Sequence, residues 1–123
     1  RQLSKDLNIP VEIVGAPIVR EEDGLAMSSR NRYLSEKERL IAPELYRNLQ
    51  LVAERVIARP NDCERICRLA RIELLERGFE AVDYITICHG ETLEALTAYN
   101  HPARIFGAAR LGQARLIDNL PIS

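Results

Sequence analysis

The sequence predicts an α+β domain with about two main helices and a roughly three-stranded antiparallel sheet, preceded by the last helix and strand of another unit. Three observations predict this architecture. Ser35 and Glu38 form a capping box at the start of an amphipathic stretch. A second helical stretch ends at Gly78, and a glycine is expected just after a helix C-terminus. Further on, two strand-like runs flank the pair Gly112-Gln113, which is typical of a hairpin turn.

The first residues differ from the rest of the chain. Residues 1–8 have the pattern of a helix end, and residues 11–14, VEIV, form a short apolar run. Such a run suits a strand of a parallel sheet, which is buried on both faces. We therefore expect residues 1–16 to end a preceding domain and residues 17–123 to form the next one. Because the chain starts at Arg1, we also expect it to be a piece of a longer protein.

A long loop is expected over residues 15–30, which show neither helical nor strand periodicity. The segment contains two glycines and Pro17, which break regular structure. Loops of this length in compact domains tend to carry function. Loops that bind ligands come from the less stable end of a structure, so we expect this one to be the most mobile internal segment.

Two helical stretches follow, each with one apolar stripe. Pro43 lies within the first stretch and lacks a backbone donor, so we expect that helix to kink or restart there. The second helix should begin at Asn61 or Asp62. The side chains expected to be buried are Ile41, Leu45, Leu49, Val52 and Val56 in the first stretch and Ile66, Leu69, Ala70 and Leu74 in the second.

The last third of the chain predicts the sheet. Val82 to Cys88 is rich in β-branched and aromatic residues, as strands are. Residues 91–97 fit either a helical turn or a short connector. Residues 103–111 and 114–120 form the two arms of the predicted hairpin.

Composition excludes several classes of function. The chain has 17 Lys and Arg and 18 Asp and Glu, well mixed, for a net charge of -1, so it lacks the basic face that non-specific nucleic-acid binding needs. No apolar run approaches the roughly 18 residues that span a membrane. Cys63, Cys67 and Cys88 fit no zinc or disulfide pattern, so we expect reduced thiols and no metal site.

Chemistry concentrates in the string from Asp23 to Asn31. Ser28 and Ser29 can each donate one hydrogen bond to a phosphate, and the Arg30 guanidinium can donate a planar fork. The alternative is that the two serines cap the helix that follows and that Arg30 is exposed in its first turn. On chemistry alone we favour this alternative, because Ser-Ser-Arg is too short to be specific.

The wider string resembles the signature of pantothenate synthetases. Residues 15–20, GAPIVR, and then DGLAMSSRNRYLS through Ser35 carry the resemblance. Residues 108–112, AARLG, and 115–119, RLIDN, are similar to the end of that family's sequences. The resemblance covers nearly all of this chain but only the C-terminal portion of the family's length.

The resemblance implies an ATP-dependent ligase that joins pantoate to β-alanine through a pantoyl adenylate. It implies a Rossmann-like nucleotide-binding domain, whose last helix and strand residues 1–16 would be, followed by a smaller lid domain. ATP would be a substrate, with Mg²⁺ held mainly by the N-terminal domain. We further expect a cytoplasmic homodimer.

Five positions match the family's ATP site. The resemblance implies contacts to ATP from Val19, Met27, Ser28, Ser29 and Arg30, and a catalytic role for the last three. The Met-Ser-Ser-Arg segment would act as the second phosphate-binding motif seen in class I aminoacyl-tRNA synthetases.

Other motifs of the family have no counterpart in this chain. Neither His89 nor His101 matches its first phosphate motif, so we interpret both as surface or turn residues. Asp118 and Asn119 are interpreted as structural. We expect the chain alone to be inactive. Two alternatives remain: an interaction or dimerisation module that pairs through its sheet, and a regulatory nucleotide-binding domain.

Overall fold

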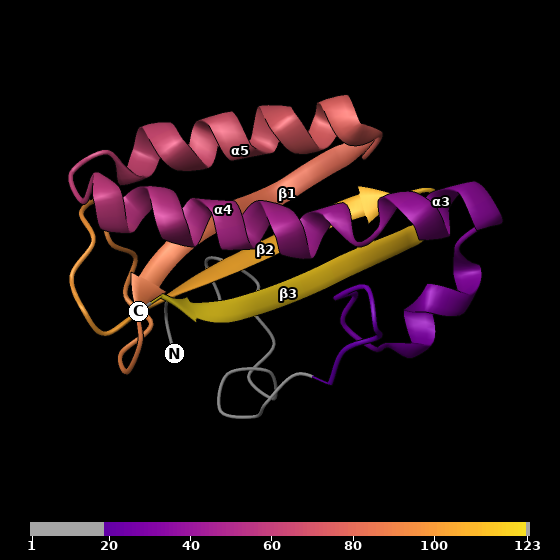
Figure 1. Cartoon of the computed structure of the whole chain (residues 1–123), viewed down its shortest axis with the longest axis horizontal. Helices are drawn as coiled ribbons and strands as arrows, with labels where there is room; N and C mark the ends of the chain where they lie inside the picture. The colour runs from indigo at the N-terminus through magenta and orange to yellow at the C-terminus, as the bar shows by residue number, and fades with distance from the viewer. Residues whose placement is uncertain (1–18, 123) are drawn as a thin grey trace.

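Two layers make up the part of the chain that the structure describes, with helices covering one face of an antiparallel sheet (Figure 1). The structure is a computed structural model and describes residues 19–122, except for the side chains of Ser29 and Arg30. The predicted helix end at residues 1–8, the predicted strand at 11–14 and the domain boundary after residue 16 lie outside the described residues.

The capping box and the proline break are confirmed. The Ser35 backbone N–H donates to Glu38 Oε1 at 2.9 Å, and the Glu38 N–H donates to Ser35 Oγ at 3.1 Å. These bonds start helix α3, Glu36–Ile41. The chain then restarts at Pro43, which takes the N-cap position of helix α4, Glu44–Ala58. A proline is tolerated there because the first turn of a helix has no partner for its N–H.

Helix α5, Cys63–Arg77, begins after Asp62 and ends before Gly78, as predicted. Its buried side chains are Cys63, Ile66, Ala70 and Leu74, which form one stripe at helical spacing. The prediction that Leu69 is buried is wrong, because Leu69 is 45% exposed. One residue corresponds to about 100° around a helix, so the neighbour of buried Ala70 falls outside the stripe.

The sheet has the order β1-β2-β3, and all neighbours are antiparallel. Strands β1, Ala81–His89, β2, Ala103–Leu111, and β3, Ala114–Ile122, are up to two residues longer than predicted. Gly112 opens the predicted turn between β2 and β3 with a φ of 62°, the left-handed region that favours glycine. Residues 91–97 form a non-helical connector that touches β1 through a bridge between Cys88 and Ala95.

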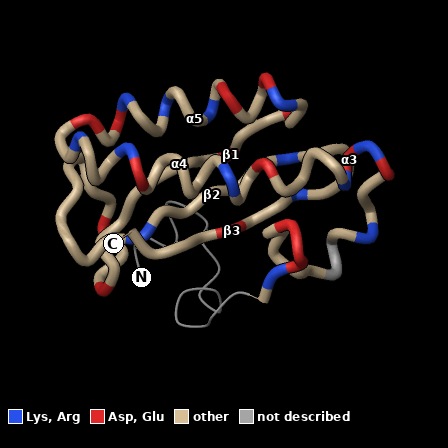
Figure 2. The backbone as a smooth tube through the Cα atoms, viewed as in Figure 1, with Lys and Arg blue, Asp and Glu red and all other residues tan. Residues whose placement is uncertain are grey.

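The main core lies between the helices and the sheet. Leu49, Val52 and Val56 of α4 are fully buried, as is Ile105 of β2, whereas Ile41 of α3 is only partly buried and packs against this core. Figure 2 shows charges of both signs interspersed along the helices instead of a single basic face. None of the helices described is long and apolar enough to cross a membrane.

Candidate functional site

Residues 19–28, which we call the site loop, fold back on themselves. The Met27 N–H donates to the Val19 carbonyl oxygen at 2.8 Å, and the Glu21 N–H donates to the Leu25 carbonyl oxygen at 2.8 Å. An isolated bridge pairs Arg20 with Ala26 between these bonds. The predicted site residues Val19 and Met27 therefore lie side by side although they are eight positions apart. The two residues are 67% and 53% exposed.

The site loop leads directly into a 3₁₀ helix, η1, Ser29–Tyr33. The exposed residue Ser28 lies just before it, and its carbonyl oxygen accepts the Asn31 N–H at 3.1 Å. The Asn31 side-chain amide donates back to the Ala26 carbonyl oxygen at 3.0 Å. Ser29 and Arg30 are thus the first two residues of η1, and their side chains lie outside the described residues. The backbone brings all five predicted positions into one continuous segment.

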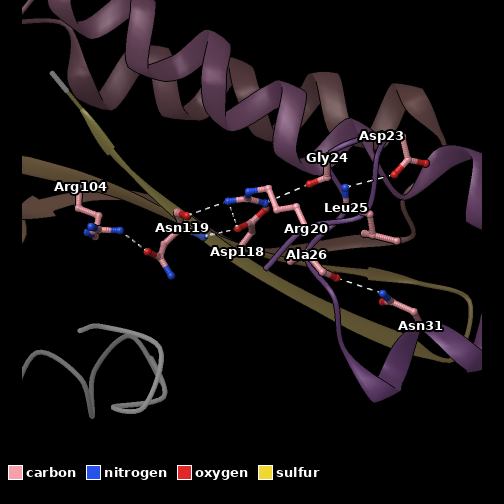
Figure 3. Close-up of polar contacts among 9 residues, drawn as sticks. All are labelled: Arg20, Asp23, Gly24, Leu25, Ala26, Asn31, Arg104, Asp118 and Asn119. Atoms are coloured by element: carbon pink, nitrogen blue, oxygen red, sulfur yellow. Dashed lines mark hydrogen bonds and ion pairs between the residues drawn. The ribbon is translucent and has the colours of Figure 1, made fainter. Parts of the chain in front are cut away.

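Arg20 attaches the site loop to β3 (Figure 3) and also contacts α4. Its Nη1 and Nη2 donate to the two carboxylate oxygens of Asp118 in β3 at 2.6 and 2.8 Å. The guanidinium also donates to the carbonyl oxygens of Gly24 at 3.1 Å and Asn119 at 3.2 Å. Its central carbon lies 3.9 Å from the centroid of the Tyr46 ring. Sequence reasoning did not single out Arg20, although it lies within the segment that carries the resemblance.

Asp118 is deeply buried, with only 3% of its side chain exposed. Burial raises the pKa of its carboxyl, and the hydrogen bonds and charge of Arg20 oppose that rise. Without Arg20 the pKa of this carboxyl would therefore rise further. Asp118 lies in a mostly apolar strand. A carboxylate buried there needs a cation nearby, and that requirement is the sequence signal that could have predicted a partner.

Asn119 continues this polar cluster on β3. Its backbone N–H donates to Asp118 Oδ1 at 2.8 Å, and its side-chain Oδ1 accepts from Arg104 at 2.6 Å. The structural interpretation of Asp118 and Asn119 fits these contacts, because both residues are buried and bonded to other parts of the fold. Their partner Arg20 nevertheless links them to the site loop.

A second ion pair holds the tip of the site loop. Arg39 of α3 donates to the two oxygens of Asp23 at 2.7 and 3.3 Å. The hydrogen bond from Arg39 lowers the pKa of Asp23. The two side chains are 35% and 42% exposed, so solvent screens this pair far more than the pair at Asp118. At the neighbouring Gly24, a Cβ would collide with the Tyr46 ring, so the loop lies flat against α4.

The two histidines do not contribute to the site loop. His89 ends β1, and its Nδ1 accepts the backbone N–H groups of Glu91 and Thr92 at 3.1 and 3.2 Å. His101 is exposed and precedes Pro102. Both arrangements agree with the interpretation of these residues as turn and surface groups.

The residues described hold no group of three or more His, Cys, Asp or Glu side chains suited to a metal ion. The resemblance places the Mg²⁺ that accompanies ATP mainly in the N-terminal domain. The three cysteines are free thiols. Burial raises the pKa of Cys67 to about 12 and that of Cys88 to about 11, which disfavours their reactive thiolate forms.

Known proteins match this chain along nearly its whole length. A pantothenate synthetase from Alkalilimnicola ehrlichii is 49% identical over 121 residues, which cover 98% of this chain and 42% of the relative. One from Dinoroseobacter shibae is 51% identical over 123 residues, covering 99% and 43%. The chain thus spans well under half the length of these curated relatives.

Solved structures agree with the sequences. A crystal structure of pantothenate synthetase from Thermus thermophilus matches with a TM-score of 0.73 and 44% identity, over 99% of this chain and 44% of that one. A pantoate-β-alanine ligase from Francisella tularensis, complexed with β-γ ATP and β-alanine, matches with a TM-score of 0.55 and 27% identity, over 98% and 37%. The pantoate-beta-alanine ligase family model matches residues 1–121, and the chain therefore belongs to that family.

Proposed function

We propose that this chain is the C-terminal part of an enzyme that joins pantoate to β-alanine with ATP, and that five of its residues contribute to the ATP site, namely Val19, Met27, Ser28, Ser29 and Arg30. In the first step the pantoate carboxylate attacks the α-phosphate of ATP, giving pantoyl adenylate and pyrophosphate. In the second step the β-alanine amine attacks the activated carbonyl and releases AMP and pantothenate. The Francisella tularensis ligase, whose structure contains β-γ ATP and β-alanine, supports these substrate classes.

The observation that carries this proposal is the placement of Val19 and Met27 on a loop fixed to the rest of the fold. Two exposed apolar side chains lie side by side, and the hydroxyl of Ser28 follows at once. A nucleotide needs both kinds of contact, because its base and ribose are partly apolar and its phosphates accept hydrogen bonds. The site loop therefore has a surface for the base next to donors for the phosphates.

Ser28, Ser29 and Arg30 would act on the phosphates. Each hydroxyl can donate one hydrogen bond, and the guanidinium donates a planar pair while keeping its charge. Negative charge grows on pyrophosphate as it leaves in the first step. Donors aimed at that charge stabilise the transition state, and phosphoryl and nucleotidyl chemistry relies mainly on such positioning and electrostatics.

The test separates the two steps in a full-length ligase that carries this segment. Arg30→Ala should slow adenylate formation by roughly 10²–10³, the usual effect of losing one donor to a developing anion. The second step should change little, because pyrophosphate has already left. The measurement is single-turnover kinetics from ATP and pantoate, and separately from preformed pantoyl adenylate with β-alanine.

Arg32→Ala is the matched control, since Arg32 lies two residues further along η1 and is exposed beside Tyr33. It should leave both steps near the parent rates. If Arg30→Ala leaves adenylate formation as fast as Arg32→Ala does, Arg30 has no phosphate-binding role. We also propose that the full-length enzyme is a cytoplasmic homodimer, which sedimentation of the purified ligase would test.

A further inference from the structure

The buried contacts of Arg20 have no role in the reaction described so far. Arg20 is adjacent to Val19, whose carbonyl oxygen accepts the Met27 N–H within the site loop. It reaches the carboxylate of Asp118, which is 98 residues away in the sequence, through two hydrogen bonds. We propose that Arg20 and Asp118 are positioning residues that hold the site loop in its ATP-binding geometry.

This inference rests on the proposed ATP site, and the contacts of Arg20 support it. The guanidinium bonds Gly24 within the loop, Asp118 and the Asn119 carbonyl on β3, and stacks on Tyr46 of α4. One side chain thus joins the loop to both the sheet and a helix. Its planar fork matches both oxygens of a carboxylate, which fixes direction as well as distance. A lysine could supply the charge but not this fixed direction.

The pair is suited to positioning because it is buried. The Arg20 and Asp118 side chains are 19% and 3% exposed, whereas those of the Asp23–Arg39 pair are 42% and 35% exposed. A buried partner cannot exchange its contacts freely for water, so the loop is held in one place. The exposed pair at the loop tip can open at little cost. The two ion pairs therefore offer a matched comparison within one loop.

The predicted consequence is a loss of ATP affinity. When the loop leaves its competent position for most of the time, the apparent affinity falls in proportion to the competent fraction. A competent population of about 1–10% corresponds to a rise in the KM for ATP of roughly 10- to 100-fold. Pantoate makes no contact with these residues in the proposal, so its KM should stay within about threefold of the parent value.

The experiment uses a full-length ligase that carries this segment, with Asp118→Asn as the main variant and Asp23→Asn as its control. Both replace a carboxylate by an amide in an ion pair of the same loop. Asp118→Asn should raise the KM for ATP and leave the KM for pantoate and the rate from saturating pantoyl adenylate near their parent values. Asp23→Asn should leave all three near their parent values.

Arg20→Lys guards against a folding failure of Asp118→Asn, because it keeps a cation beside the buried carboxylate. It should raise the KM for ATP while the unfolding temperature stays close to that of the parent. If Arg30→Ala slows adenylate formation but Asp118→Asn and Arg20→Lys leave the KM for ATP unchanged, the positioning role is wrong and the ATP site stands. If all three variants leave ATP use unchanged, the proposed site is wrong as well. If the KM values for ATP and pantoate rise equally and the unfolding temperature falls, the pair has a purely structural role.

Discussion

The helix-covered face of the sheet and the site loop are held by opposite kinds of interaction. Between α4 and β2, buried aliphatic side chains such as Leu49 and Ile105 exclude water from the interface. Along β3, the site loop is held mainly by a guanidinium, a carboxylate and backbone carbonyls. Apolar packing has no fixed direction, whereas the polar contacts fix where each group points. The apolar region therefore supplies stability, and the polar region supplies the position of a few exposed side chains.

The largest expected effect concerns catalysis by the two regions together, which we expect to be incomplete as a catalyst. The chain alone should release no AMP above background when it is mixed with ATP, pantoate and β-alanine. The reason is that it spans only 42% of the length of a relative and supplies the proposed ATP loop without the family's other substrate motifs. Turnover near that of a full-length ligase would mean that the described residues bind all three substrates.

Amide hydrogen exchange should separate the two regions next. Backbone N–H groups of Ile105 and Gly107 lie in the central strand β2, so their exchange should require nearly global unfolding. Those of Glu21 and Met27 are bonded only within the site loop and should exchange by local opening. We expect protection factors that differ by on the order of 10³ or more. Equal protection in both places would mean that the loop unfolds together with the core.

Truncation in the apolar region should cost more than any change at the loop tip. Leu49→Ala removes a fully buried side chain and should lower the free energy of unfolding by about 2–5 kcal/mol. Leu51→Ala is the control, because Leu51 lies on the same helix but is 41% exposed, and should cost less than about 1 kcal/mol. Urea unfolding of both variants measures the difference. If the two variants lose a similar free energy of unfolding, the core does not lie where Leu49 is buried.

The smallest expected effect belongs to the exposed pair of Asp23 and Arg39. Asp23→Asn should lower the free energy of unfolding by less than about 1 kcal/mol near neutral pH. Because Arg39 lowers the pKa of Asp23, the stabilising contribution is present above the ordinary pKa of 3.8 and is lost as the pH falls through the folded-state value. The gap between parent and variant should therefore close as the pH falls below that ordinary value. A gap that persists in strong acid would show that the effect is not due to the charge of Asp23.

The sequence contains enough local information to predict most of the elements. The capping box, the restart at Pro43 and the turn at Gly112 each depend on residues within four positions of one another, and all are confirmed. Leu69 was predicted to be buried because apolar periodicity does not fix the edges of a stripe, and only packing against neighbouring elements does so.

The candidate site likewise has one part that the sequence predicts and one part that it does not. The resemblance pointed to a continuous segment from Val19 to Arg30, which sequence alone can supply. The contact between Arg20 and Asp118 joins residues 98 positions apart. The sequence can indicate that a buried Asp118 needs a cation, but no local pattern encodes which cation it is. The polar anchoring of the site therefore became visible only in three dimensions.

The contacts at Asn119 also affect how the molecule resists self-association. Within the described part of the chain, strand β3 pairs only with β2, so its other side is an edge of the sheet. The N–H and C=O of Asn119 are bonded to Asp118 and Arg20, and Pro121, two residues further along the same strand, has no N–H to offer. A strand from another molecule would have to break a buried ion pair before it could extend the sheet there. Arg20 therefore occupies one point of this edge, and an edge whose backbone groups are already bonded is a poorer template for the pairing through which exposed strands aggregate.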